Sequence, residues 1–263
     1  MTNSGNAEAR LLLEPDEPPA FEVVNAHGNS HAVLVCDHAS NRVPRRLGTL
    51  GLEPVQLAAH IGWDPGAAEV ARRISAQLDA PLVLSGYSRL VVDCNRRLHS
   101  AELIAEHSAG VPVPGNHRLS SDDRAVRIST LFEPYHNVIR TLLDDRSQRP
   151  TLLLSIHSFT PVLDNKSRPW HIGVSNGADC RLAALMLHAL AHDASIFVGD
   201  NQPYPIDNAF DYTIPVHGES RGLLNVMIEI RQDAIATTAG AAAWAARLVE
   251  TYRQIEADAL SFY

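Results

Sequence analysis

The chain has few cysteines and no closely spaced pair. Cys36, Cys94 and Cys180 lie far apart, and no C-x-x-C motif is present. Such a set is typical of reduced thiols and provides no disulfide framework. No apolar run reaches the roughly 18 residues that a membrane span needs. Because Leu11–Leu13 is short and is followed by acidic residues, we expect no signal peptide and a cytoplasmic protein.

A basic excess is also absent. Lys and Arg number 22 against 30 Asp and Glu, which gives a net charge of −8. Proteins that bind nucleic acid or anionic membranes carry a positive excess, so we expect neither as a partner and expect a small-molecule substrate instead. Neither standard glycine-rich phosphate-binding loop occurs, so nucleotide chemistry has no support.

What the chain does have is an alternation of apolar runs and helical segments. Strands are expected at 21–24, 32–36, 81–84, 89–93, 151–156, 171–174, 195–198 and 223–230, and helices at 53–61, 64–78, 121–148, 179–192 and 234–259. This order predicts an α/β fold, with a mostly parallel mixed sheet and helices on both faces. We expect a single domain over residues 20–263, preceded by a flexible tail or surface wrap at 1–19.

Ligand-type side chains end or interrupt the predicted strands. His38 follows the apolar run Val33–Cys36, His157 ends a second run, and Glu229 lies within the apolar segment Met227–Ile230. A carboxylate among apolar neighbours is costly to bury unless it is paired or near a metal. The alternatives are a hydrogen-bonded structural role for each histidine, and a solvated or arginine-paired Glu229. Together the residues favour a metal site built from strand ends.

Asp64 is the candidate third ligand. A catalytic zinc site uses three protein ligands and leaves a position for water, with a nearby carboxylate as general base. Asp64 also precedes Pro65 at the start of a predicted helix, so a plain helix N-cap is the alternative. The sequence leaves both interpretations open.

The segment Arg89–Arg97 places Asn95 and Arg96 at the end of a predicted strand. Arginine is suited to binding a carboxylate through two parallel hydrogen bonds, so this segment is a candidate substrate site. The alternative is an ion-pair cluster in which Arg96 or Arg97 pairs with Asp93.

Two further motifs are rejected. Gly218–Gly222 matches the G-x-S-x-G nucleophile pattern, but a strand and not a helix is expected after Ser220, and no histidine follows His217. His188 and His192 share one helix face without the glutamate of H-E-x-x-H, so we expect surface histidines there.

Taken together, these segments resemble the N-formylglutamate amidohydrolase family. The matching pieces occur in family order at residues 36–44, 62–64, 88–96, 155–158, 200–204 and 217–231. The resemblance implies a fold similar to zinc carboxypeptidases and aspartoacylases. It also implies hydrolysis of an N-acyl amino acid, in the best-known case N-formyl-L-glutamate to formate and glutamate in histidine degradation.

The resemblance implies site residues as well. The ligand histidines, the Asn-Arg pair and the late glutamate of the wider superfamily fall on His38, His157, Asn95–Arg96 and Glu229. One position departs, because Asn41 stands where the family has a ligand glutamate. Either Asp64 takes that role, or metal binding is weaker or altered.

The expected mechanism follows from this assignment. Zinc would be bound by His38, Asp64 and His157, and Glu229 would move the proton of the attacking water to the leaving nitrogen. The substrate carboxylates would be bound by a set of polar side chains, Asn95, Arg96 and either Arg89 or Arg221.

Two alternatives stay open at this point. One is a metal-free binding or regulatory protein on the same scaffold, which Asn41 favours. The other is a zinc peptidase acting on short peptides, whose substrate the long loops 99–123 and 199–222 would restrict or admit.

Overall fold

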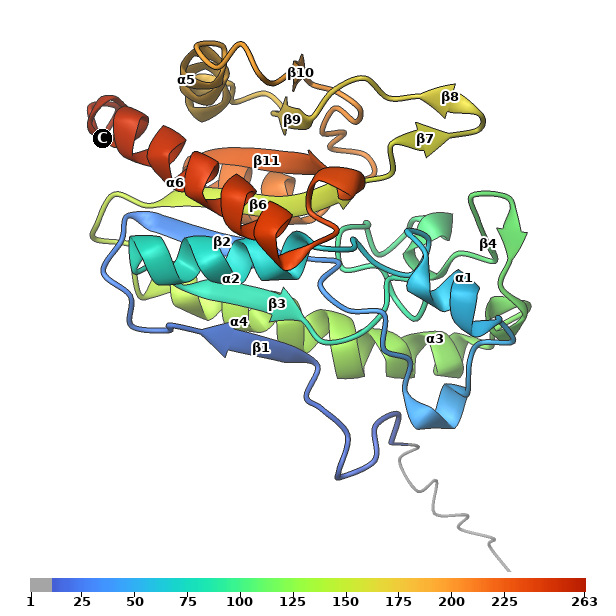
Figure 1. Ribbon diagram of the computed structural model, residues 1–263. Coiled ribbons are helices and arrows are strands. Elements are labelled where there is room, and N and C mark those ends of the chain that lie inside the picture. Colours follow the sequence, from blue (N-terminus) through green and yellow to red (C-terminus); the bar gives the residue numbers. More distant parts are fainter. Residues whose placement is uncertain (1–10) are drawn as a thin grey trace, which may run out of the picture.

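The computed structural model describes residues 11–263 and is built around one seven-stranded sheet (Figure 1). The strand order is β1-β3-β2-β6-β11-β9-β10. The strands are β1 (Phe21–Val24), β2 (Ala32–Cys36), β3 (Leu82–Ser85), β6 (Leu152–Phe159), β9 (Ile172–Ser175), β10 (Val198–Asp200) and β11 (Leu224–Arg231). The central strands β3, β2, β6 and β11 are parallel, whereas β1 and β9 each run antiparallel to their central neighbour. The predicted mostly parallel mixed sheet is therefore confirmed.

Helices cover both faces of this sheet, as predicted (Figure 1). Helices α2, α5 and α6 pack on one face and α4 packs on the other. The helices are α1 (Pro54–Ala58), α2 (Ala67–Leu78), α3 (Ser121–Arg127), α4 (Glu133–Asp144), α5 (Arg181–Leu190) and α6 (Thr238–Leu260). Two small hairpins complete the fold, β4–β5 (His107–Ser108, Val111–Pro112) and β7–β8 (Val162–Leu163, Lys166–Ser167). Within residues 11–263, no helix is both long and apolar enough to cross a bilayer.

The central strand β2 shows why its sequence is continuously apolar. Ala32, Leu34 and Cys36 belong to the hydrophobic cluster under α2 and α6, while Val33 and Val35 belong to the cluster under α4. Successive side chains point to opposite faces of a sheet, and both faces are covered here. The core thus fixes the direction of β2, and the chain that follows it emerges at the carboxyl edge of the sheet.

The strand predicted at Arg89–Asp93 is wrong. The segment forms turns, in which the Val91 amide bonds to the Ser88 carbonyl at 2.9 Å and the Asp93 amide to the Leu103 carbonyl at 2.8 Å. Its apolar residues pack into a separate hydrophobic cluster that lies under the loops. Burial in that cluster, and not pairing in the sheet, accounts for its apolar run.

Residues 11–19 lie against the body of the protein, which for this part favours the surface wrap over the flexible tail, the two alternatives left open for residues 1–19. Leu12 is buried in the cluster beneath the loops, and Glu14 and Glu17 form ion pairs with Arg46 and Arg45. An apolar anchor with flanking ion pairs makes this segment a wrap. The remainder of the predicted tail lies outside the described residues.

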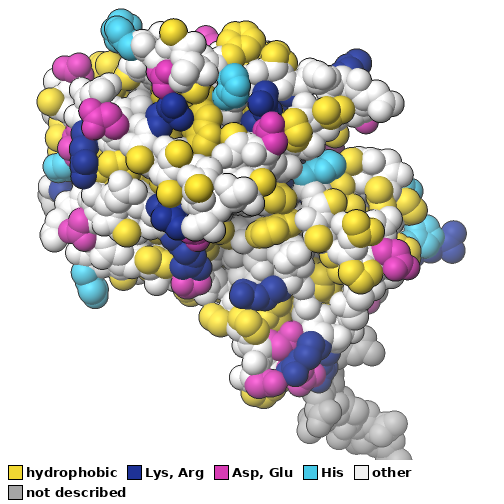
Figure 2. All heavy atoms as spheres, viewed as in Figure 1, with side chains coloured by type: hydrophobic (Ala, Val, Ile, Leu, Met, Phe, Trp, Pro, Cys, Tyr) yellow, Lys and Arg dark blue, Asp and Glu magenta, His cyan; other side chains and the backbone are white. Residues whose placement is uncertain are grey.

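Charges of both signs are spread over the face in view (Figure 2). Lys and Arg side chains alternate there with Asp and Glu side chains and with apolar ones, and no basic field covers this face. A cluster of ionisable groups is buried at the carboxyl edge of the sheet.

Candidate active site

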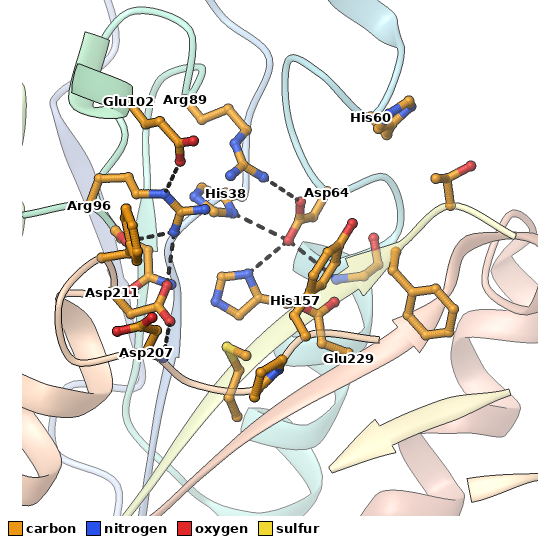
Figure 3. A pocket seen from close by; sticks show the side chains of 18 of the residues that line it. His38, His60, Asp64, Arg89, Arg96, Glu102, His157, Asp207, Asp211 and Glu229 are labelled. Atoms are coloured by element: carbon orange, nitrogen blue, oxygen red, sulfur yellow. Dashed lines mark hydrogen bonds and ion pairs between the residues drawn. The ribbon is translucent and has the colours of Figure 1, made fainter. Parts of the chain in front are cut away.

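The candidate site lies where the central parallel strands end. His38 follows β2 by two residues, His157 lies on β6, and Glu229 lies on β11 directly opposite His157 in the strand register. All three side chains are buried. Asp64 comes from the loop before α2, and its backbone amide bonds to the His38 carbonyl at 2.9 Å. The structure thus brings together the four residues for which metal and acid–base roles were predicted (Figure 3).

His38, Asp64 and His157 converge on one point. Asp64 Oδ2 lies 2.9 Å from His157 Nδ1 and 3.4 Å from His38 Nδ1. One ligand-type atom from each residue lies within 4.8 Å of the others. Two imidazole nitrogens and a carboxylate oxygen are a donor set that zinc accepts.

The outer nitrogen of each imidazole is held by a second, buried carboxylate. His38 Nε2 lies 2.7 Å from Asp93 Oδ1, and His157 Nε2 lies 3.1 Å from Asp37 Oδ2. A carboxylate on the outer nitrogen fixes the ring orientation and leaves the inner nitrogen, here Nδ1, as a ligand. This carboxylate–histidine pairing is the arrangement found around metal-binding histidines.

Two buried polar atoms of the site lack hydrogen-bond partners among the described residues, and they show whether a metal would fit. Within residues 11–263, neither His38 Nδ1 nor Glu229 Oε2 has a hydrogen-bond partner. Buried polar atoms are normally satisfied, and each exception requires an explanation. A cation between the Nδ1 atoms and Asp64 Oδ2 would satisfy the first, and a water beside it would satisfy the second. The residues present therefore fit a bound metal.

The charge balance supports the same conclusion. Burial disfavours the charged form of Asp64, yet the positive charge of His38 and the hydrogen bond from His157 hold the pKa of Asp64 below its ordinary value. Burial acts against protonation of His157, but its hydrogen bonds to Asp37 and Asp64 hold its pKa well above its ordinary value. The carboxylates thus attract positive charge to this point, which protons or a metal cation can supply.

Glu229 differs from the aspartates because its carboxylate has no cationic contact partner among the described residues. Burial, and to a lesser extent the charge of Asp64, raises the pKa of Glu229 to about 7. A carboxyl group with a pKa near neutrality can both accept and donate a proton, which is the property that a general base and acid needs.

The three polar residues predicted from the segment Arg89–Arg97 all line the same cavity, of about 400 Å³. Arg96 is paired with Asp211 at 2.8 Å and with Glu102 at 3.2 Å. The Asn95 side chain accepts hydrogen bonds from the amides of Tyr212 and Thr213. Asn95 therefore fixes the loop beside the cavity, and Arg96 lies at the cavity wall.

Arg89 also reaches the cavity, where it lies between two carboxylates. Its Nη2 donates to Asp93 at 2.9 Å, and Nη1 lies 3.6 Å from Asp64 Oδ1. Its charge offsets the two aspartates that flank His38. This geometry favours a positioning role for Arg89 over a contact with substrate.

Arg221 is not part of the site, which corrects its predicted role in substrate binding. Its guanidinium pairs with Asp144 at 2.6 Å, and it lines a different cavity together with Thr151, just before β6 begins. Arg221 itself comes just before β11 begins, and both of these strands carry their site residues nearer their carboxyl ends. Arg221 therefore lies near the amino end of β11, away from the carboxyl edge of the sheet where the site is.

Asn41 does not approach the candidate ligands either. It lines a separate cavity with Trp63 and Arg72.

The carboxylate beside the two histidines comes from Asp64. The N-cap alternative for Asp64 does not hold, because Gly66 occupies the N-cap of α2 with a φ of 83°. His188 and His192 are exposed near the end of α5, as expected.

The two supporting aspartates, Asp37 and Asp93, were not predicted from the sequence. Asp37 was visible as the neighbour of His38, and Asp93 was considered only as a partner of Arg96 or Arg97. Asp37 in turn accepts hydrogen bonds from the hydroxyls of Tyr135 and Thr213, which are distant in the sequence. No local pattern marks these two, because the contact exists only in the folded chain.

Comparisons with known proteins identify the family and the fold. Residues 30–236 match the sequence model of a family described as N-formylglutamate amidohydrolase. A solved gene product of Agrobacterium tumefaciens is 38% identical, with a TM-score of 0.91 over 94% of this chain and 98% of that chain. The comparison with curated proteins gave no match.

Two more distant solved structures share the fold. An N-formylglutamate amidohydrolase from Ralstonia eutropha JMP134 is 17% identical, with a TM-score of 0.66 over 90% of this chain and 99% of that one. A bacteriophage poly-gamma-glutamate hydrolase is 14% identical, with a TM-score of 0.50 over 94% and 93% of the two chains. At such identities the likeness concerns the fold alone.

Proposed function

Because the chain belongs to the N-formylglutamate amidohydrolase family, it is an amide-hydrolysing enzyme, and we propose that it uses zinc to cleave N-formyl-L-glutamate into formate and L-glutamate. The observation that carries the proposal is the convergence of His38, Asp64 and His157 beside an unpartnered, buried Glu229. A metal position and a proton-transfer group in one cavity are the two components that hydrolysis of an unactivated amide needs.

The metal would be held by His38 Nδ1, Asp64 Oδ2 and His157 Nδ1. Bound there, zinc would polarise the formyl carbonyl and lower the pKa of water. Asp93 and Asp37 keep the two imidazoles oriented, and Arg89 keeps Asp93 and Asp64 in place.

Glu229 supplies the proton transfer in this proposal. Its carboxylate accepts a proton from the attacking water, and the resulting carboxyl group donates that proton to the amide nitrogen as the C–N bond breaks. Burial among apolar strand neighbours gives it the raised pKa that this double role requires. Arg96, at the cavity wall, binds the α-carboxylate of the substrate, and Asn95 holds the adjoining loop in place.

The proposal is tested by measuring zinc content and formate release together. We expect the purified protein to hold one zinc per chain and to release formate from N-formyl-L-glutamate, and we expect a chelator to abolish turnover. The variants H38A and H157A should lose zinc. H188A, which removes an exposed histidine on α5, is the matched control and should keep both zinc and activity. A protein that folds, holds no zinc and releases no formate would contradict the proposal and favour the metal-free alternative.

A further inference from the structure

Behind one aromatic wall of the cavity lies Arg168, a cation for which residues 11–263 provide no acidic partner. Arg168 follows β8, and its guanidinium carbon lies 4.7 Å from the ring centre of Tyr204 and 5.9 Å from that of Phe159. Tyr204 and Phe159 both line the cavity. Arg168 Nη2 donates to the Tyr204 hydroxyl at 2.6 Å, whereas Nη1 is buried without a hydrogen-bond partner in residues 11–263.

A second unsatisfied group lies near it. His60 lines the same cavity, and its Nε2 is buried without a hydrogen-bond partner among the residues described (Figure 3). Burial, together with the positive charges of Arg89 and Arg168, lowers the pKa of His60. Both arginines therefore act on His60 through their positive charge, which places Arg168 and His60 in one electrostatic environment.

The two arginines that line the cavity, Arg89 and Arg96, differ from Arg168 behind its aromatic wall, because each already has carboxylate partners. Arg96 is bound by Asp211 and Glu102, and Arg89 by Asp93 with Asp64 nearby. For Arg168, by contrast, the side-chain hydrogen bond found in the described part of the chain goes to a neutral hydroxyl. A buried guanidinium nitrogen without a partner is costly, and a carboxylate is its strongest partner.

The backbone of Tyr204 and that of Arg168 are each held in place by a hydrogen bond. The Tyr204 carbonyl accepts a hydrogen bond from the Ser175 hydroxyl at 2.7 Å, and the Arg168 carbonyl accepts one from Arg231 at 3.3 Å. A side chain on Gly173 would place a Cβ only 1.7 Å from the Gln202 carbonyl oxygen, so glycine is what lets this loop approach β9. The Arg168–Tyr204 pair is therefore positioned before any ligand arrives.

We propose that Arg168, together with His60 and Tyr204, forms an anion subsite that binds the side-chain carboxylate of an N-acyl glutamate. The inference rests on the proposed function and adds the part of the molecule that selects an acidic side chain. Arg168 Nη1 and His60 Nε2 donate to the carboxylate, and the rings of Phe159 and Tyr204 pack against the methylene groups. In Figure 3, Arg96 and His60 lie on different sides of the candidate ligands, so Arg96 is available to bind the α-carboxylate.

The test compares N-formyl-L-glutamate with its neutral isostere N-formyl-L-glutamine, using the zinc-loaded enzyme. In R168M the side chain keeps its packing on both rings and loses its charge. We expect KM for N-formyl-L-glutamate to rise about 10- to 100-fold, since a charge-assisted hydrogen-bond pair is lost, while kcat for this substrate and KM for N-formyl-L-glutamine change less than about threefold. R168K should recover part of the preference for the acidic substrate.

The matched control is R247M, because Arg247 also lies over an aromatic ring, 4.9 Å from the centre of Trp244, but outside this cavity. It should leave both KM values unchanged. The inference is overturned if R168M weakens both substrates equally or leaves both unaffected. If the wild-type protein releases formate from neither substrate, the proposed function fails, and calorimetric binding of L-glutamate against L-glutamine decides the subsite alone. A glutamate preference that R168M abolishes then supports the subsite, and equal binding of the two amino acids refutes it.

Discussion

Replacing Asp37 by asparagine tests how the site orients its metal ligands. Asp37 accepts hydrogen bonds from Tyr135 at 2.8 Å, Thr213 at 2.7 Å, Ser155 at 3.1 Å and His157 Nε2 at 3.1 Å. An asparagine of the same shape can keep the oxygen that faces Tyr135 and Thr213. Its amide NH2 then faces His157, whose Nε2 must become an acceptor and move its proton to Nδ1, the atom proposed to bind zinc.

We expect D37N to fold and to bind zinc about 10- to 100-fold more weakly, which is about 1.4 to 2.8 kcal/mol. Competition against a chromophoric chelator measures this affinity, and near-UV circular dichroism checks the fold. D144N is the matched control, because it makes the same chemical change at an exposed carboxylate paired with Arg221. A folded D37N protein that binds zinc as tightly as the wild type would refute the proposed orientation of His157.

Three further outcomes are expected. R221M should change KM for N-formyl-L-glutamate less than about twofold in steady-state kinetics, because Arg221 lies outside the cavity; a tenfold rise would restore its predicted role. Burial lowers the pKa of His136 to about 4 and that of His217 to about 3, so the folded protein leaves both neutral while the unfolded chain binds protons below about pH 6.5. The free energy of unfolding should therefore decrease as the pH is lowered through this range. In urea titrations, its decrease between pH 7 and pH 5 should be about 2 kcal/mol smaller in H136Q than in the wild type. Equal losses in the two proteins would refute a neutral, buried His136.

The sheet was the most predictable part of the molecule. The bounds of β1 and β2 agree with the strands predicted at 21–24 and 32–36. In β2 the signal is strongest, because a strand buried on both faces is apolar throughout. The same signal failed at Arg89–Asp93, where an apolar run packs under loops. An apolar run records burial, and burial alone does not distinguish a strand from a well-packed turn.

The position of a site residue was predictable where its own strand marks it by a local sequence pattern. His38, His157 and Glu229 end or interrupt apolar runs, and parallel strands bring their carboxyl ends to one edge of the sheet. Partners set by tertiary contacts were not predictable. Asp93 pairs with His38 across 55 positions of sequence, and Arg168 reaches the cavity wall through a hairpin that no local pattern indicates.

The most direct test of the account is formate release by E229Q, with zinc content measured on the same preparation. Glutamine keeps the shape of Glu229 but cannot accept the proton of the attacking water, and it lies beside the ligands without being one of them. The account predicts that E229Q holds one zinc per chain, as the wild type does, while formate release from N-formyl-L-glutamate falls at least about 100-fold. Turnover by a zinc-loaded E229Q protein at a rate near that of the wild type would contradict it.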